Sequence, residues 1–396
     1  MTGPKRSKKY ILGILGILGG LLVLCIAVLA VSALINRGLP TQSETVDRLS
    51  ELDKARLAEL LHLKESLGEQ VWPGLGQADI PIILYNEAYA FLIENPKQPP
   101  PGWTFVHSDQ VHGGPWEPVP SDSFQGAVYY RSQLLAPNET PQAFTVQIGD
   151  RWAASMTTKN WTQIKLASMI RDELPPPLAA VFPYSLYTGV FNSDWHISAV
   201  LHEAFHAYIG TVDLERLKGS EAATAFEDDY PREDGGMQED WQVELDLLAE
   251  ALGATSDEQA ANLAYEFLAQ RENRRNRHQL DSSLVDYERQ REWSEGLAKY
   301  IELEFWRQAS ENEAYEPLSS LAADPDFNSY TTFEKQWNQE VSQMKRMAGD
   351  DGDGRFYYSG MAQAVLLDRL MPGWKARAMQ DGVFLEDLLS DTVGTK

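Results

Sequence analysis

His202, Glu203 and His206 form an HExxH sequence inside an apolar stretch from Ile197 to Ile209. On an α-helix, side chains four positions apart share a face, so both imidazoles can bind one metal ion while Glu203 projects beside them. Imidazole nitrogens suit zinc, and the carboxylate is placed to accept a proton from a water that the metal activates. Random order would produce the motif in roughly one chain of this composition in a hundred. The motif therefore predicts metal-assisted hydrolysis with Zn²⁺ as the cofactor.

A catalytic zinc site needs a third protein ligand and leaves its fourth position to water. No third histidine follows the motif at the metzincin spacing, so we expect a carboxylate. Glu295 and Glu302 share one face of a predicted helix, 284–309, with the small Ala298 between them. The small side chain would let this helix approach the HExxH helix closely. Two glutamates on an intervening predicted helix are the alternatives: Glu244 and Glu250.

The motif, followed by Glu295 in an EGxAxYxE segment, resembles the gluzincin group of zinc metallopeptidases, which includes aminopeptidase N-like and thermolysin-like enzymes. The resemblance covers residues 195–305, and the second histidine and the glutamate are farther apart here than in those enzymes. It implies that His202, His206 and Glu295 bind Zn²⁺. It also implies that Glu203 is the general base in the hydrolysis of peptide bonds.

In many gluzincins a downstream tyrosine or histidine stabilises the oxyanion that develops during hydrolysis. The resemblance therefore implies a catalytic role for Tyr357 or Tyr358, at the head of a predicted C-terminal helix. His196 and His278 are the alternatives. Both tyrosines could instead serve only to pack the start of that helix.

The patterns around these residues predict an α+β fold in two lobes. In the mixed α/β lobe, 76–193, we expect a buried strand at 80–84, a Pro/Gly-rich loop at 95–120 and a β-hairpin at 143–156. The lobe that follows, 194–396, is expected to be mainly helical and to bind the zinc. Helices are predicted at 197–209, 241–252, 257–270, 284–309, 333–347 and 359–370. The resemblance implies that the whole is zincin-like, with the hairpin binding peptide by strand addition.

Residues 11–35 carry no charged side chain. As a helix with a rise of about 1.5 Å per residue, they would cross the roughly 30 Å hydrocarbon core of a bilayer. The basic residues of the preceding tail, 1–10, place it in the cytoplasm by the positive-inside rule. This predicts a single-pass protein of the cell membrane, with a juxtamembrane helix or stalk at 36–75 and an extracytoplasmic domain after it.

The same apolar segment has one alternative interpretation and one possible further property. A cleaved signal peptide would also begin with basic and then apolar residues, although its apolar region is usually shorter. Gly16 and Gly20 form a GxxxG pair, which would allow two transmembrane helices to form a weak homodimer.

Composition excludes several classes of function. The chain has 396 residues, with 58 acidic against 34 basic side chains and a formal net charge of -24, so nucleic acid is not an expected partner. The single cysteine, Cys25, excludes an intramolecular disulfide and a CxxC metal site. The expected partner is a peptide or protein substrate. The alternatives are a membrane-tethered zincin-like binding or scaffold protein without protease activity, and a zinc amide hydrolase that acts on a cell-envelope substrate.

Overall fold

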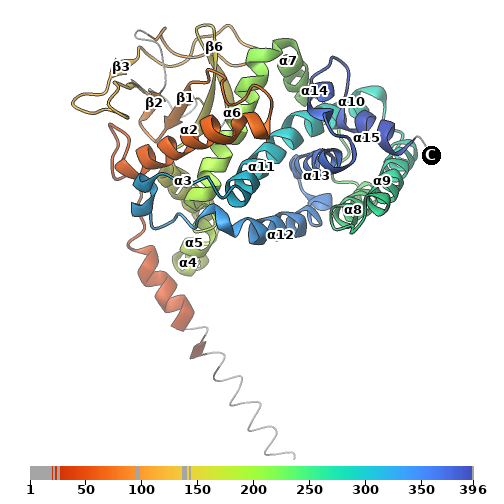
Figure 1. The fold of residues 1–396 in the computed structure, drawn as a ribbon. Coiled ribbons are helices and arrows are strands. Elements are labelled where there is room, and N and C mark those ends of the chain that lie inside the picture. The colour runs from red at the N-terminus through yellow and green to blue at the C-terminus, as the bar shows by residue number, and fades with distance from the viewer. Residues whose placement is uncertain are drawn as a thin grey trace, which may run out of the picture.

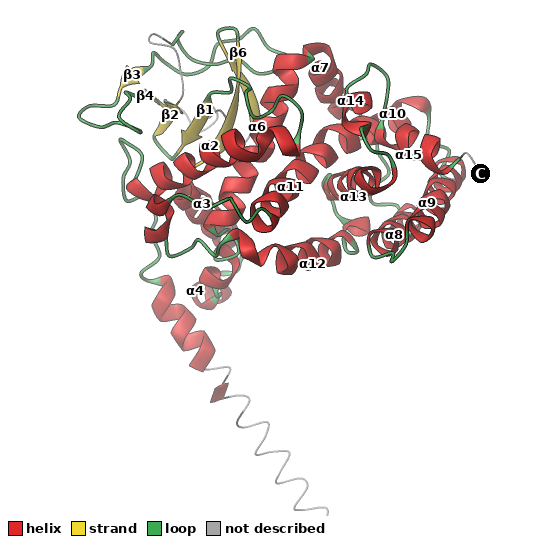
Figure 2. Ribbon diagram, viewed as in Figure 1, coloured by secondary structure: helices red, strands yellow, loops and turns green. Residues whose placement is uncertain are grey.

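The computed structural model describes residues 20, 23–24, 27–93, 99–135, 141 and 144–394. Over these residues the protein is α+β, with one mixed sheet near the N-terminal end of the body and helices around and beyond it (Figure 1). Figure 2 shows that the strands gather at one end of the body and that helices alone form the other end. The predicted class is therefore confirmed at this level.

The sheet has six strands in the order β3-β4-β2-β1-β6-β5. Their bounds are β1 Ile82–Tyr85, β2 Tyr89–Ile93, β3 Glu117–Pro118, β4 Tyr130–Gln133, β5 Phe144–Ile148 and β6 Arg151–Thr157. β1 and β6 are parallel, and the other neighbours are antiparallel. The predicted hairpin is confirmed as β5 and β6, joined at Gly149, whose φ of +64° suits a residue without a Cβ. The predicted strand at 80–84 is confirmed as β1.

Alternate residues of β6 face the two sides of the sheet, as the twofold period of a strand requires. Trp152 and Met156 belong to the large core shared with the helices, whereas Ala153 belongs to a second, smaller core. That smaller core contains Trp103 and Trp116 from the Pro/Gly-rich loop. The described part of this loop therefore covers the face of the sheet that lies away from the helices.

The helical part confirms the predicted helices and adds several that were missed. The helices that match a predicted segment are α2 Glu51–Val71, α6 Ser193–Val212, α8 Gly235–Leu252, α9 Asp257–Arg277, α10 Ser282–Arg291, α11 Leu297–Glu311, α12 Phe333–Met344 and α13 Gly354–Leu370. The helices that were missed are α3 Lys159–Glu173, α4 Pro176–Val181, α5 Tyr184–Thr188, α7 Leu214–Ala223, α14 Trp374–Ala378 and α15 Leu385–Val393. The prediction of one regular α-helix at 284–309 is wrong in one respect. A π-helical segment, Glu292–Gly296, lies between α10 and α11.

The predicted membrane segment, 11–35, and the tail before it lie largely or wholly outside the described residues, as does Gly16 of the GxxxG pair. Among the residues that are described, no helix is both long and apolar enough to span a bilayer. Residues 27–36 are helical and project from the body (Figure 1). Within the predicted juxtamembrane region, α2 packs against α6 and α11 through buried leucines, among them Leu60 and Leu67.

Candidate metal centre

Helix α6 presents the two histidines of the HExxH motif. It starts at the N-cap residue Asn192, whose side chain accepts a hydrogen bond from the backbone N–H of Trp195 at 2.8 Å. The helix passes through the core beside β6 and is buried along most of its length. His202 and His206 are both buried, one helical turn apart, and their Nε2 atoms lie 3.2 Å from each other. The i and i+4 geometry predicted from the sequence is confirmed.

The π-helical segment presents Glu295 to the same point. The backbone of this wider turn lies directly against the backbone of α13. A Cβ on Gly296 would stand only 2.4 Å from the Cα of Gly360, so the contact requires glycine. Glu295 Oε2 lies 3.2 Å from His202 Nε2 and 3.5 Å from His206 Nε2. Single π turns inside α-helices are frequent at functional sites, where they redirect side chains.

His202, His206 and Glu295 form a buried group whose ligand atoms all lie within 4.8 Å of one another. Among the described residues this is the one His/Cys/Asp/Glu group that could hold a metal ion. The side chains come from positions far apart in the chain, and packing of α6 against the α10–α11 helix brings them together. The donor set of two imidazoles and one carboxylate can therefore bind a divalent cation.

A second layer of hydrogen bonds orients these three side chains. Glu302 Oε2 lies 3.4 Å from His202 Nδ1, and Ser294 Oγ lies 3.5 Å from His206 Nδ1. Arg291 Nη2 lies 3.1 Å from Glu295 Oε1, the oxygen that points away from the histidines. Contacts of this kind hold the ring and carboxylate orientations that a metal site needs.

The charges around the site favour a cation between the three ligands. Burial by itself would lower the pKa of His202, but hydrogen bonds to Glu295 and Glu302 outweigh it and raise that pKa to about 10. Burial would raise the pKa of Glu295, but Arg291 and His206 outweigh it and hold that pKa well below its usual range. The carboxylates thus remain ionised and stabilise positive charge at the imidazoles.

Glu203 lies on the same helix beside a cavity of about 410 Å³. The cavity has apolar walls at Met156, Trp195 and Ala199 and also reaches His202. Burial raises the pKa of Glu203, and the neighbouring imidazoles only partly oppose this shift. A raised pKa makes this carboxylate a stronger base, which suits it to accept a proton.

The two tyrosines predicted as oxyanion donors have different partners. Tyr357 stacks on the His202 ring with 5.7 Å between ring centroids, and burial together with the nearby charge of Glu295 raises its pKa. Tyr358 instead donates to Glu340 Oε2 at 2.7 Å. Both residues line the cavity. Of the two, Tyr357 lies at the metal-binding group.

The alternative ligands and donors lie elsewhere. Glu244 is fully buried between Arg271 and Arg274, and Glu250 is exposed on α8. His196 Nε2 lies 2.8 Å from the carbonyl oxygen of Thr157, and burial lowers its pKa to about 4. His278 Nε2 lies 2.9 Å from Asp240 Oδ2 at the end of α9. None of the four belongs to the metal-binding group.

The sequence interpretation missed the charged residues that support the site. Lys299 Nζ lies 3.3 Å from both Glu302 Oε1 and Glu340 Oε2, so it fixes the carboxylate behind His202. Arg291 lies four positions before Glu295, a spacing at which a salt bridge on a helix could have been expected. The link to Glu340 depends on the packing of α12, and no local pattern indicates it.

We expect the Arg291→Met variant to bind a divalent metal about 10–100-fold more weakly, the usual effect of losing an outer partner of a metal ligand. Without the guanidinium, Glu295 Oε1 would be buried with no cation beside it. Competition with a chelator of known affinity would measure the change. Arg277→Met removes an exposed arginine on α9 and should leave the affinity unchanged. Equal affinities in wild type and Arg291→Met would show that the guanidinium does not position Glu295.

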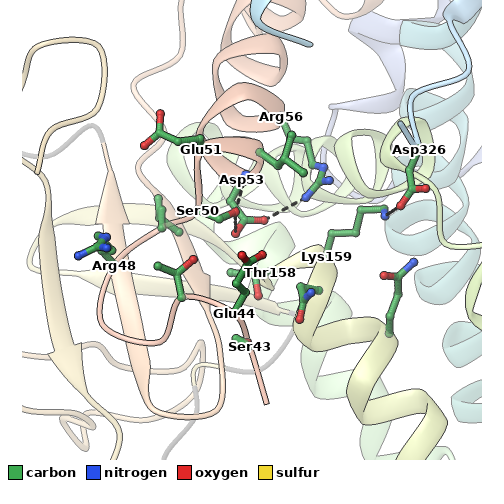
Figure 3. A pocket seen from close by; sticks show the side chains of 15 residues that line it. Ser43, Glu44, Arg48, Ser50, Glu51, Asp53, Arg56, Thr158, Lys159 and Asp326 are labelled. Carbon is green, nitrogen blue, oxygen red and sulfur yellow. Dashed lines mark hydrogen bonds and ion pairs between the residues drawn. The ribbon is translucent and has the colours of Figure 1, made fainter. Parts of the chain in front are cut away.

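A second cavity, of about 490 Å³, lies where α2 and α3 begin (Figure 3). Its buried cations already have partners. Arg56 contacts Asp53 at 3.2 Å and Asp324 at 2.7 Å, and Lys159 pairs with Asp326. No HExxH residue lines this cavity. The metal-binding group and Glu203 therefore remain the candidate site.

Comparison of the chain with known protein families, with curated proteins and with solved structures gave no match.

Proposed function

We propose that this protein is a zinc-dependent metallopeptidase, anchored in the cell membrane through residues 11–35, with its catalytic domain outside the cytoplasm. One observation carries the catalytic part. The three ligand atoms of His202, His206 and Glu295 are separated by 3.2, 3.2 and 3.5 Å. Ligands about 2.05 Å from a tetrahedral zinc ion are about 3.3 Å from each other. The side chains are thus spaced as three corners of a zinc tetrahedron.

The nature of the donors supports zinc as the cofactor. Two imidazoles and one carboxylate form a three-ligand set of catalytic zinc sites, in which the fourth position is left to water or substrate. Magnesium and calcium prefer all-oxygen surroundings, so they fit this group less well.

Bound zinc would supply Lewis-acid polarisation of a substrate carbonyl and acidification of a water. Glu203 would accept the proton of that water and pass it to the leaving amine. Tyr357, whose pKa burial raises well above its usual range, keeps its hydroxyl proton and can donate a hydrogen bond to the developing oxyanion. Arg291 and Glu302 would hold Glu295 and His202 in place throughout.

The position of β5 supports a peptide as the substrate and a zincin-like arrangement. β5 is an edge strand that lies along α6, with Thr145 Oγ1 donating to the Glu203 carbonyl at 3.4 Å. Thr104 already pairs with Gln147 on the outer edge of this strand. The stretch around Thr145, next to Glu203, is where an extended peptide could add to the sheet.

Metal content by mass spectrometry on the purified full chain tests the zinc site. We expect about one zinc ion per wild-type chain, and loss of that ion in both His202→Ala and Glu295→Ala, because two ligands alone bind zinc weakly. Glu250→Ala, an exposed glutamate of α8, is the matched control and should retain the metal. Wild-type protein without zinc after reconstitution would overturn the enzyme proposal and favour a membrane-tethered binding protein.

Tyr357→Phe is expected to lower kcat on a fluorogenic peptide mixture by about 10²–10³-fold, the usual effect of removing one oxyanion donor. Tyr358→Phe removes the same atom from the adjacent residue, whose hydroxyl is bound to Glu340, and should stay close to wild type. Zinc content should be normal in both variants. Equal losses in the two variants would indicate packing of the helix start in place of a role in catalysis.

A further inference from the structure

Helices α4 and α5 expose an apolar surface. No charged residue occurs from Leu174 to Ser193, a stretch that contains both helices. Four of its large side chains are between 52% and 72% exposed: Leu178, Leu186, Tyr187 and Val190. We call these four residues the α4–α5 patch. Single exposed apolar side chains are ordinary, but several on one small element indicate a binding surface.

Other contacts hold this element in a defined shape. α4 and α5 are too short to be stable alone. The Tyr184 hydroxyl donates to the Ala179 carbonyl at 2.9 Å, and the Arg171 guanidinium lies over the Tyr184 ring at 5.3 Å. Tyr184 is fully buried, so α4 and α5 are fixed to the body while the side chains of the α4–α5 patch are exposed.

The N-terminal helix, residues 27–36, meets the body at α4 and α5. The Asn36 side chain donates hydrogen bonds to the carbonyls of Ala180 and Phe182, at 3.1 and 2.9 Å. Figure 1 shows the helix of residues 27–36 leaving the body beside α4 and α5. Its exposed side chains, Leu34 and Ile35 among them, are also apolar. Asn36 directly follows the apolar segment 11–35, so the α4–α5 patch is fixed at the point where that segment meets the body.

We propose that the α4–α5 patch inserts into the interfacial region of the bilayer and that its partner is lipid. The inference rests on the membrane anchor of the proposed function. Leucine, valine and tyrosine side chains are favourable at the boundary between headgroups and acyl chains. Arg37, Arg171 and Asp172 line the pocket between the N-terminal helix and α4, and the two guanidinium groups can pair there with lipid phosphates.

This placement limits where the enzyme can act. α6 begins at Ser193, five residues after the end of α5, and His202 follows nine residues later. At about 1.5 Å per residue, His202 lies about 14 Å along α6 from the first residue of that helix. Contact with lipid through two adjacent elements, the anchor and the α4–α5 patch, would keep the cavity close to the membrane surface and orient it.

Fluorescence quenching in vesicles tests the proposal on the full chain. Cys25 is the single cysteine, so Cys25→Ser permits one label at Leu186→Cys, at Val190→Cys or at Tyr265→Cys. Tyr265 is similarly exposed and belongs to α9, a helix at the opposite end of the body from α4 and α5 (Figure 1). Each labelled protein is reconstituted into phosphatidylcholine vesicles with and without a nitroxide lipid. We expect loss of most of the emission at 186 and 190, and little loss at 265.

Three results would overturn the proposal, and they are distinguishable. Protein that does not float with the vesicles would refute the membrane anchor and the inference with it. Protein that floats, but whose labels at 186 and 190 are quenched no more than the label at 265, would refute the inference alone. Emission that responds to the density of protein and not to nitroxide lipid would assign the α4–α5 patch to a second copy of the chain.

Discussion

Glu203→Gln is expected to lower kcat for peptide hydrolysis by about 10²–10⁴-fold, the usual contribution of a positioned general base. The amide has almost the shape of the carboxylate, but it cannot accept a proton. Glu203 is not among the three grouped ligands, so the variant should keep its zinc. The measurement is kcat on a fluorogenic peptide mixture together with zinc content for each preparation.

One control variant and two contrary outcomes make this result specific. Glu250→Gln, the same change at an exposed site on α8, should leave both kcat and zinc content unchanged. A Glu203→Gln variant that loses its zinc would indicate a structural role for the carboxylate. A variant that keeps zinc and also keeps wild-type activity would show that another group accepts the proton, and would contradict the mechanism.

Glu288→Gln is expected to lower the free energy of unfolding by about 3 kcal/mol, because it removes the charge of one of the two buried carboxylates that pair with Arg274. Glu288 and Arg274 are both fully buried and form an ion pair, and Arg275 Nε lies 2.8 Å from the same carboxylate. They belong to a larger network behind the metal-binding group. Its members are Arg271, Arg274 and Arg275 of α9 with Glu244, Glu288, Glu292 and Glu386. Urea unfolding followed by tryptophan fluorescence would measure the loss.

The same pair predicts how stability depends on pH. Burial would raise the pKa of Glu288, but Arg274 and Arg275 outweigh it and hold that pKa far below its usual range. The stabilisation is therefore complete above the unfolded-state pKa of about 4.3 and is lost as the pH falls toward the folded-state value. We expect wild type to lose stability below about pH 4.3 more steeply than Glu288→Gln. An unchanged midpoint at pH 7, or parallel acid profiles, would contradict this.

Some features of the site follow from local sequence. The spacing of His202 and His206 places them on one face of any helix that forms there, and Asn192 and the apolar run around the motif favour a helix. The β5–β6 hairpin is similarly local, because its two strands are joined directly at Gly149. Such features depend on neighbours within a few residues, and they were predicted correctly.

The choice of the third ligand depended on packing. Glu244 and Glu295 were both plausible in sequence, since each lies on a predicted helix. In the folded chain Glu244 neutralises Arg271 and Arg274, whereas the π turn and the contact of Gly296 with Gly360 direct Glu295 to the histidines. The π turn lies in close contact with α13, a helix much later in the chain. The helical periodicity of residues 284–309 alone gives no sign of that contact.

By itself, the sequence determined the two histidines and the carboxylate beside them, because the geometry of a single helix relates these residues. It also determined the class of the fold, because strand and helix periods can be recognised segment by segment. Only the tertiary structure decided that Glu295 completes the group, that Tyr357 and not Tyr358 lies against it, and that Arg291 and Glu302 support it. These relations join segments far apart in the chain, and their distances depend on how helices pack rather than on any local pattern.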